Sequence, residues 1–378
     1  MKRFRSVGQV LFSAALLAGS VAGATAPVAA QQVETAAGAP QAVDVRPSIY
    51  WGAYVPDWPA DTLEPIQAFE QTAGKKVSMI QWGSPWVIQD NYVPFPGKYF
   101  DLVRSHGAIP MLDWGAQDLA VRGGEQPNFA LARIIEGSHD WYIRLWAQQA
   151  KQWGHPFFLR LNPEMNGWWL PWSEQINGNQ PGEYVQAWRH VVDIFRQEGV
   201  SNVTWVWCPN IVGQYSTPLE GLFPGNDYVD WTCMDGYNWG TDNGNSGWWS
   251  LTDVFSGSEY TGYFNTYQQL LDLAPGKPVM IGETASSENG GSKAAWIRAA
   301  LTKELQTNFP RVQAFVWFNS NNNDPALTWP VDSSPQARAA FAEAIAGPMF
   351  ATSSYGSLAT SPIPPPDQVV LPPTAPKP

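Results

Sequence analysis

Between residues 48 and 350 the chain repeats one pattern: a short apolar run, a polar or aromatic turn, and a helical stretch. Short apolar runs bounded by turn residues predict buried strands, and strands that alternate with helices favour a parallel sheet. Eight such units over about 300 residues predict a (β/α)8 barrel in one domain. A doubly wound sheet is the alternative, but no Gly-rich phosphate loop follows any run. The predicted strands are Ile49–Tyr54, Val77–Trp82, Ala108–Asp113, Phe157–Leu161, Val203–Trp207, Trp231–Met234, Val279–Gly282 and Val312–Phe318.

Two of the stretches between these runs have clear helical periodicity. From Pro181 to Gly199, apolar side chains recur every three or four residues, with Pro at the start and Gly at the end. A second helix is predicted from Trp141 through Trp146 toward Trp153.

The two ends of the chain differ from this central region. Lys2, Arg3 and Arg5 precede a short apolar run, Val10–Ala22, which predicts a signal peptide over residues 1–30 and secretion of the mature protein. That run is too short to predict a membrane anchor. Residues 31–47 predict a flexible lead-in, and the Pro- and Ser-rich residues 351–378 predict a disordered tail.

Composition limits the partners. The net charge is −11, which argues against a nucleic-acid-binding or polybasic membrane protein. The chain holds 21 Trp, more than a core needs, and flat rings with a polar edge suit a surface that stacks on sugars. Cys208 and Cys233 lie in a chain expected to be exported, so both a disulfide and two buried thiols remain open. Neither has His or Cys neighbours at metal-ligand spacing.

Polar and aromatic residues follow the predicted strands where each strand ends. In a barrel these ends share one face, on which catalytic groups lie. The acidic residues there are Asp113, Glu164, Asp235 and Glu283. Hydrolysis of a glycosidic bond needs two carboxyl groups, and Glu164 and Glu283 follow the fourth and seventh predicted strands, which face each other across the barrel mouth. The pattern therefore predicts a glycosidase.

Four segments resemble glycoside hydrolase family 26, which contains β-mannanases and some β-glucanases and β-xylanases. They are LRLNPEMNGWWLPW at 159–172, YVDWTCMDGYNWG at 228–240, KPVMIGETAS at 277–286 and VQAFVWFN from 312. The resemblance implies a retaining (β/α)8 hydrolase in which Glu164 is the acid/base and Glu283 the nucleophile. It also implies that Arg160 organises the charged site, that Tyr237 bonds the nucleophile, and that Trp317 forms the floor under the sugar.

One position departs from the family pattern, in which His precedes the acid/base. This chain has Pro163, which lacks a side-chain donor and a backbone N–H. The identity of the sugar is therefore open, and Asn162 is a candidate for the replacement contact, aided by a cis bond at Pro163.

We predict a secreted, monomeric, retaining endo-β-glycanase for β-1,4-mannan or a related β-glucan, with no metal or cofactor. Two carboxyl groups about 5–5.5 Å apart are expected for retention. The alternatives are a non-catalytic polysaccharide-binding protein and an enzyme that acts on a bacterial exopolysaccharide. The predicted substrate-binding residues are Trp82, Asp113, Trp114, Trp169, Trp172, Trp239 and Trp317.

Overall fold

The computed structural model describes residues 48–242, 247–322, 324 and 326–370. The predicted signal peptide over residues 1–30 and the predicted lead-in over 31–47 lie outside these residues. Among the helices of the described part, none is both long enough and apolar enough to cross a membrane.

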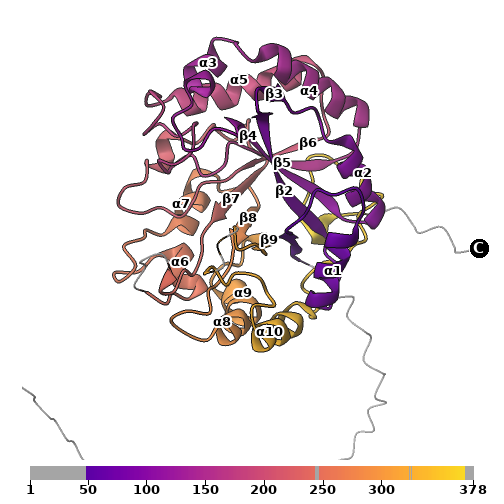
Figure 1. The fold of residues 1–378 in the computed structure, drawn as a ribbon, viewed down its shortest axis with the longest axis vertical. Helices are drawn as coiled ribbons and strands as arrows, with labels where there is room; N and C mark the ends of the chain where they lie inside the picture. Colours follow the sequence, from indigo (N-terminus) through magenta and orange to yellow (C-terminus); the bar gives the residue numbers. More distant parts are fainter. Residues whose placement is uncertain (1–47, 243–246, 323, 325, 371–378) are drawn as a thin grey trace, which may run out of the picture. The chain divides into compact units, whose positions relative to one another are not determined.

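Eight parallel strands close into a barrel, because β1 pairs with β2 on one side and with β9 on the other. The helices surround the strands (Figure 1). This confirms the (β/α)8 barrel and excludes the open doubly wound sheet. The barrel strands are β1 (Tyr50–Tyr54), β2 (Met79–Ile88), β4 (Ile109–Asp118), β5 (Phe157–Leu161), β6 (Val203–Trp207), β7 (Trp231–Asp235), β8 (Val279–Thr284) and β9 (Val312–Phe318).

The connections between the strands carry the helices. Both helices predicted from periodicity are present, as α4 and α5. The helices are α1 (Glu64–Ala73), α2 (Gly97–His106), α3 (Leu131–Ile135), α4 (Asp140–Trp153), α5 (Glu183–Gln197), α6 (Leu251–Ser256), α7 (Thr266–Leu273), α8 (Lys293–Ala299), α9 (Leu305–Thr307) and α10 (Pro335–Ile345).

Two strands run further than their apolar runs suggested. β2 and β4 remain paired from Gly83 and Asp113 up to Val87 and Asp118. After β2 the chain turns back at Gln89–Asp90, where both residues have positive φ, into the short antiparallel strand β3 (Asn91–Tyr92). The predicted strand ended at Trp82, but an isolated Gly such as Gly83 inside a strand pattern does not have to end the strand.

Strand residues alternate between two apolar cores. On β9, Phe315 and Trp317 face the helices, whereas Ala314 and Val316 face the barrel axis. Successive side chains of a strand point to opposite faces, so this alternation also decides which polar side chains can reach the barrel mouth.

The segment after Phe350 covers the end of the barrel at which the strands begin. Tyr355, Leu358 and Ile363 are buried in the interior core. The Trp231 indole, on the first residue of β7, donates to the Ile363 carbonyl at 2.8 Å. The prediction of a disordered tail is therefore wrong for residues 351–370. A Pro-rich segment without periodicity still packs when its few apolar side chains fill an open barrel end.

Candidate active site

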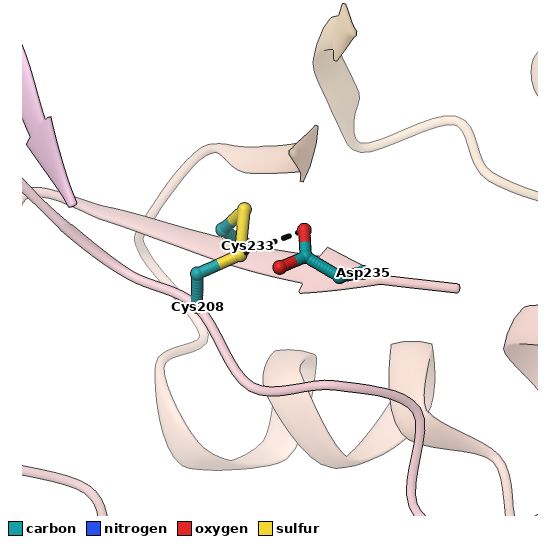
Figure 2. Close-up of side chains that lie close together, drawn as sticks. All are labelled: Cys208, Cys233 and Asp235. Atoms are coloured by element: carbon teal, nitrogen blue, oxygen red, sulfur yellow. Dashed lines mark hydrogen bonds between the residues drawn. A yellow bond between two sulfur atoms is a disulfide. The ribbon is translucent and has the colours of Figure 1, made fainter. Parts of the chain in front are cut away.

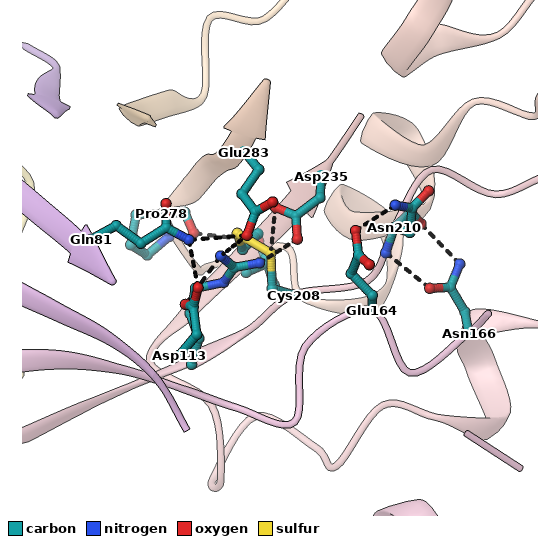
Figure 3. The surroundings of a disulfide bond; sticks show 12 residues. Gln81, Asp113, Glu164, Asn166, Cys208, Asn210, Asp235, Pro278 and Glu283 are labelled. Carbon is teal, nitrogen blue, oxygen red and sulfur yellow. Dashed lines mark hydrogen bonds and ion pairs between the residues drawn. A yellow bond between two sulfur atoms is a disulfide. The ribbon is translucent and has the colours of Figure 1, made fainter. Parts of the chain in front are cut away.

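A buried arginine lies at the centre of the charged groups in the barrel mouth. Arg160, on β5, has no exposed side-chain surface. Its guanidinium lies 2.9 Å from Glu283 Oε1 and 3.1 Å from Asp113 Oδ1, and it also pairs with Asp235 Oδ2. Three carboxylates from β4, β7 and β8 therefore share one cation (Figure 3).

Burial and the excess of negative charge raise the pKa values of two carboxyl groups in this cluster. Burial and the nearby Glu283 raise the pKa of Asp113 to about 7, although Arg160 opposes the shift. Burial also raises the pKa of Asp235 well above its usual range, again against the attraction of Arg160. Burial disfavours the charge on Arg160, but the three carboxylates raise its pKa above the ordinary value. Arg160 therefore stays charged while the carboxyl groups compete for it.

Three donors hold the carboxyl group of Glu283. The Tyr237 hydroxyl donates to Oε2 at 2.5 Å, and Arg160 donates to Oε1 at 2.9 Å. The Gln81 amide, on β2, donates both to Glu283 Oε1 at 3.1 Å and to Asp113 Oδ2 at 2.7 Å. Because donors contact both oxygens, the carboxyl group has a fixed orientation toward the barrel mouth.

Glu164 lies on the other side of the mouth, just after β5. Its Oε1 accepts a hydrogen bond from Asn210 at 2.5 Å, and its Oε2 accepts one from the Trp169 indole at 3.0 Å. Burial and the charge of Glu283 raise the pKa of Glu164. One carboxylate oxygen of Glu164 and one of Glu283 lie within 4.8 Å of each other.

The two cysteines form a disulfide inside the barrel, which answers the question that spacing left open. The sulfur of Cys208 lies 3.3 Å from Asp235 Oδ1 (Figure 2). Sulfurs bonded to each other offer no thiolate to a metal. Glu164, Asp235 and Glu283 form the other described group close enough for a metal, and Arg160 already pairs with two of its three members.

A cavity of about 720 Å³ opens beside the two glutamates, within the usual range for small-molecule sites. Its walls come from the loops after β5, β6 and β7 and from the end of β9. Aromatic side chains dominate the lining, namely Trp168, Trp169, Tyr215, Tyr237, Trp239, Tyr263, Phe318 and Trp329. Two of the predicted substrate-binding residues, Trp169 and Trp239, thus lie in the cavity wall, whereas Asp113 lies in the charge cluster.

Four of the predicted substrate-binding tryptophans are buried instead. Trp82, Trp114, Trp172 and Trp317 have at most 2% of their surface exposed, so the prediction that they bind substrate is wrong. Trp82, Trp114 and Trp317 lie on strands, and their side chains point toward the helices, in the core between the strands and the helices. The fourth, Trp172, packs under its own loop and donates to the Pro163 carbonyl at 2.7 Å.

Asn162 does not point into the site. Its side-chain oxygen accepts a hydrogen bond from the backbone N–H of Ala116 at 2.8 Å, and its carbonyl accepts one from Tyr184. The Asn162–Pro163 peptide is trans. The idea that Asn162 replaces the missing contact at Pro163 is therefore wrong.

Several site residues were not predicted: Gln81, Asn210, Phe318 and Trp329. The sequence did contain a signal for Gln81. Adjacent strand residues face opposite ways, so only one of Gln81 and Trp82 can point toward the barrel axis, and the polar residue is the better candidate. The polar residue of each strand end marks the inward face, so the neighbouring tryptophan faces outward. Trp329 comes from a long loop, for which no local pattern indicates the position.

Comparisons with known proteins agree with this geometry. A model of glycosyl hydrolase family 26 matches residues 127–266. Endoglucanase H of Acetivibrio thermocellus is 36% identical over 302 residues, which cover 78% of this chain and 30% of that protein. The chain thus spans less than a third of that relative.

Solved structures share the fold at low sequence identity. A β-mannanase of family 26 from Bacteroides ovatus has a TM-score of 0.57 and 18% identity, over 82% of this chain and 91% of that one. The mannanase BCman from Bacillus subtilis has a TM-score of 0.56 and 16% identity, over 81% and 87%. Together with the sequence match and the paired glutamates, these results show that the chain belongs to glycosyl hydrolase family 26.

Proposed function

We propose that this protein is a secreted, retaining endo-β-glycanase whose first candidate substrate is a β-linked glucan. One observation carries the proposal: Glu164 and Glu283 place carboxylate oxygens within 4.8 Å of each other in unequal surroundings. Burial raises the pKa of Glu164, as a general acid requires. Glu283 accepts hydrogen bonds from Arg160, Tyr237 and Gln81, which suit an anionic nucleophile.

The chemistry is a double displacement. Glu164 gives its proton to the leaving glycosidic oxygen while Glu283 attacks the anomeric carbon, which forms a glycosyl-enzyme ester. Glu164, now ionised, then takes a proton from water as the water attacks that carbon and displaces Glu283. The second inversion restores the original configuration. An inverting enzyme separates its carboxyl groups by about 6.5–9.5 Å to hold a water, so the closer pair supports retention.

The cavity wall supports a polymeric substrate. Trp168 is 61% exposed and Tyr215 is 78% exposed, and both line the cavity on the side of the β5 and β6 loops. Exposed rings of this kind suit stacking on sugar units beyond the one at the cleavage point. Internal cleavage follows if several units bind on that side.

The choice of glucan comes from the relative with higher identity. Endoglucanase H is 36% identical to this chain, whereas the two β-mannanase structures compared above are 16% and 18% identical. β-1,4-Mannan remains the second candidate, because family 26 contains mannanases. Pro163 at the position before Glu164 leaves the contact to the reacting sugar different from the family pattern.

Export is supported by two features. The first 30 residues have the charge and apolar pattern of a signal peptide. The disulfide between Cys208 and Cys233 fits an oxidising compartment.

The substrate test measures release of reducing ends from mixed-linkage β-glucan, carboxymethyl cellulose, glucomannan, mannan and xylan by the mature protein. We expect release from at least one β-glucan, with a rapid fall in viscosity from internal cleavage. Release from mannan alone would transfer the assignment to mannan. No release from any polymer, with binding retained, would contradict the enzyme and favour a polysaccharide-binding protein.

Replacing Glu164 with Ala tests its role as acid/base and the stereochemistry together. We expect kcat on polymer to fall about 10²–10⁴-fold and the alkaline limb of the pH profile, which reports loss of the Glu164 proton, to disappear. Azide should restore turnover of an activated aryl glycoside and give a β-glycosyl azide. An α-glycosyl azide, or inverted configuration of the wild-type product by NMR, would contradict the double displacement.

Two tryptophans of one loop should separate activity from stability. Trp169→Ala removes a hydrogen bond to Glu164. We therefore expect kcat/KM to fall by a factor that corresponds to about 1.5–3 kcal/mol of lost transition-state stabilisation, with little change in the free energy of unfolding. Trp172→Ala empties a buried site and should lower the free energy of unfolding by about 3–5 kcal/mol. Urea unfolding measures the stability of both variants, and initial rates measure their activity. Equal losses of stability in the two variants would contradict the prediction.

A further inference from the structure

We infer that the disulfide between Cys208 and Cys233 is a positioning cross-link that sets the separation of Glu164 and Glu283. The inference rests on the proposed function, because it concerns the spacing of the acid/base and the nucleophile. Figure 3 shows the arrangement: Glu283 with Asp113 and Gln81 lies on one side of Cys208, and Glu164 with Asn210 lies on the other.

The segment that begins at Cys208 holds Glu164 at two points. The backbone N–H of Glu164 donates to the Cys208 carbonyl at 2.7 Å. Two residues further on, the Asn210 amide donates to Glu164 Oε1 at 2.5 Å. Asn166 completes this contact, since its side-chain oxygen accepts from the Asn210 backbone N–H at 2.9 Å. Any shift of Cys208 therefore moves both the backbone and the carboxyl group of Glu164.

The segment that begins at Cys233 holds Glu283 at three points. Asp235 pairs with Arg160, which donates to Glu283 Oε1. The Gly236 N–H donates to the Glu283 carbonyl at 3.0 Å. The Tyr237 hydroxyl donates to Glu283 Oε2 at 2.5 Å. The disulfide thus joins the segment that holds the acid/base to the segment that holds the nucleophile.

The strands that carry these segments have a short ladder. β6 and β7 are in register only at Val206 with Trp231 and at Trp207 with Thr232. The disulfide comes one residue later on both strands. Above it, the Asp235 N–H donates to Pro209 and the Ile211 N–H donates to Asp235. The disulfide therefore lies between the two registered residue pairs of β6 and β7 and the two hydrogen bonds that follow them.

The sulfurs are closely packed against β8 and Asp235. The Cys208 sulfur touches Asp235 Oδ1 at 3.3 Å (Figure 2). A Cβ atom at Gly282 on β8 would overlap the Cys233 sulfur and lie 2.8 Å from Asp235 Oδ1. Without the link, the segments that begin at Cys208 and Cys233 are free to shift relative to each other. Asp235 shifts with them and acts through Arg160 on Glu283.

The test compares the wild type with the variant Cys208→Ser/Cys233→Ser and with Cys208→Ala/Cys233→Ala, well below their unfolding temperatures. Misplacement by about 1 Å costs up to about 10²-fold, and the hydrogen bonds above the link limit the shift, so we expect kcat to fall about 10-fold. KM should change less than about twofold, because Trp168, Trp169 and Trp329 of the cavity wall lie on other segments. The pH profile should shift, since the Glu164 pKa depends on its distance from Glu283.

Val316→Ala is the matched control, because it removes apolar volume from the same interior core and lies on β9, outside the two segments that begin at Cys208 and Cys233. It should lower stability while kcat and the pH profile stay at wild-type values. If the cysteine variants behave like this control, the disulfide has only a stabilising role and the inference is wrong.

Crystal structures of the cysteine variants provide a readout that needs no activity. A Glu164–Glu283 separation unchanged within coordinate error would overturn the inference whatever the enzyme acts on. A wild-type protein inactive on every polymer, with a changed separation in the variants, would instead overturn the proposed function and leave the cross-link standing.

Discussion

Replacing Glu283 with Gln is expected to lower kcat about 10³-fold or more, which corresponds to about 4 kcal/mol of lost transition-state stabilisation. Gln keeps the size of the side chain, and its carbonyl oxygen still accepts the hydrogen bond from Arg160. Its NH2 group replaces the oxygen that accepts from Tyr237, and the amide does not form the glycosyl-enzyme ester. Initial rates on the best polymer, and a search for the trapped ester by mass spectrometry with a fluorinated substrate, measure the effect.

The same variant should change the protonation of its neighbours. The charge of Glu283 raises the pKa of both Glu164 and Asp113, so its removal should lower both pKa values. NMR titration of carboxyl carbons reports this directly. Glu220→Gln, at an exposed site on the Leu219–Gly221 turn, is the matched control and should leave rate and titration unchanged. A Glu283→Gln variant with more than a tenth of wild-type kcat would remove Glu283 from the mechanism.

Replacing Arg160 with Met is expected to lower the free energy of unfolding by about 3–5 kcal/mol at pH 8, because it leaves buried carboxylates without their cation. The loss should shrink as the pH falls. Without Arg160 the folded-state pKa values of Asp113 and Asp235 rise further above their ordinary range, so the folded state binds more protons than the unfolded state. Stability of the variant therefore increases as the pH drops through those folded-state values.

Urea unfolding at pH 8 and at pH 5 measures both parts of this prediction. Arg160→Lys keeps one positive charge but loses the fork that reaches three carboxylates, so it should fall between the wild type and Arg160→Met. A loss below about 1 kcal/mol that does not depend on pH would mean that the cluster is solvated or already protonated, and would contradict a buried ionic centre.

Much of the site was predictable because both catalytic candidates lie at the carboxyl ends of strands. Glu164 comes shortly after β5 and Glu283 lies near the end of β8, and the rule that strand ends share one face places them together. Arg160 came from the family resemblance, and the structure places it between Asp113, Asp235 and Glu283. Asn210 was visible as a polar residue after β6, but nothing in the sequence showed that it donates to Glu164.

The errors share a cause. Trp82 and Trp114 were assigned to the cleft because they lie next to polar strand ends, and Trp317 because of the family resemblance, yet each faces the helices. When both faces of a strand are apolar, hydropathy does not distinguish inward from outward positions. The prediction of a disordered tail was wrong for a different reason. Residues 351–370 have no hydrophobic periodicity, but they fill the barrel end against β1, β6 and β7.

By itself, the order of apolar runs and turns predicted the barrel and the strand ends at which the two glutamates lie. Strand formation depends on residues close in the chain, and consecutive strand–helix units pack side by side. Contacts between residues far apart decided the rest. Arg160 and Glu283 are 123 positions apart, and Cys208 and Cys233 come together only where β6 lies beside β7. Closure of the barrel sets which side chains share its interior, and that is a property of the whole sheet rather than of any segment.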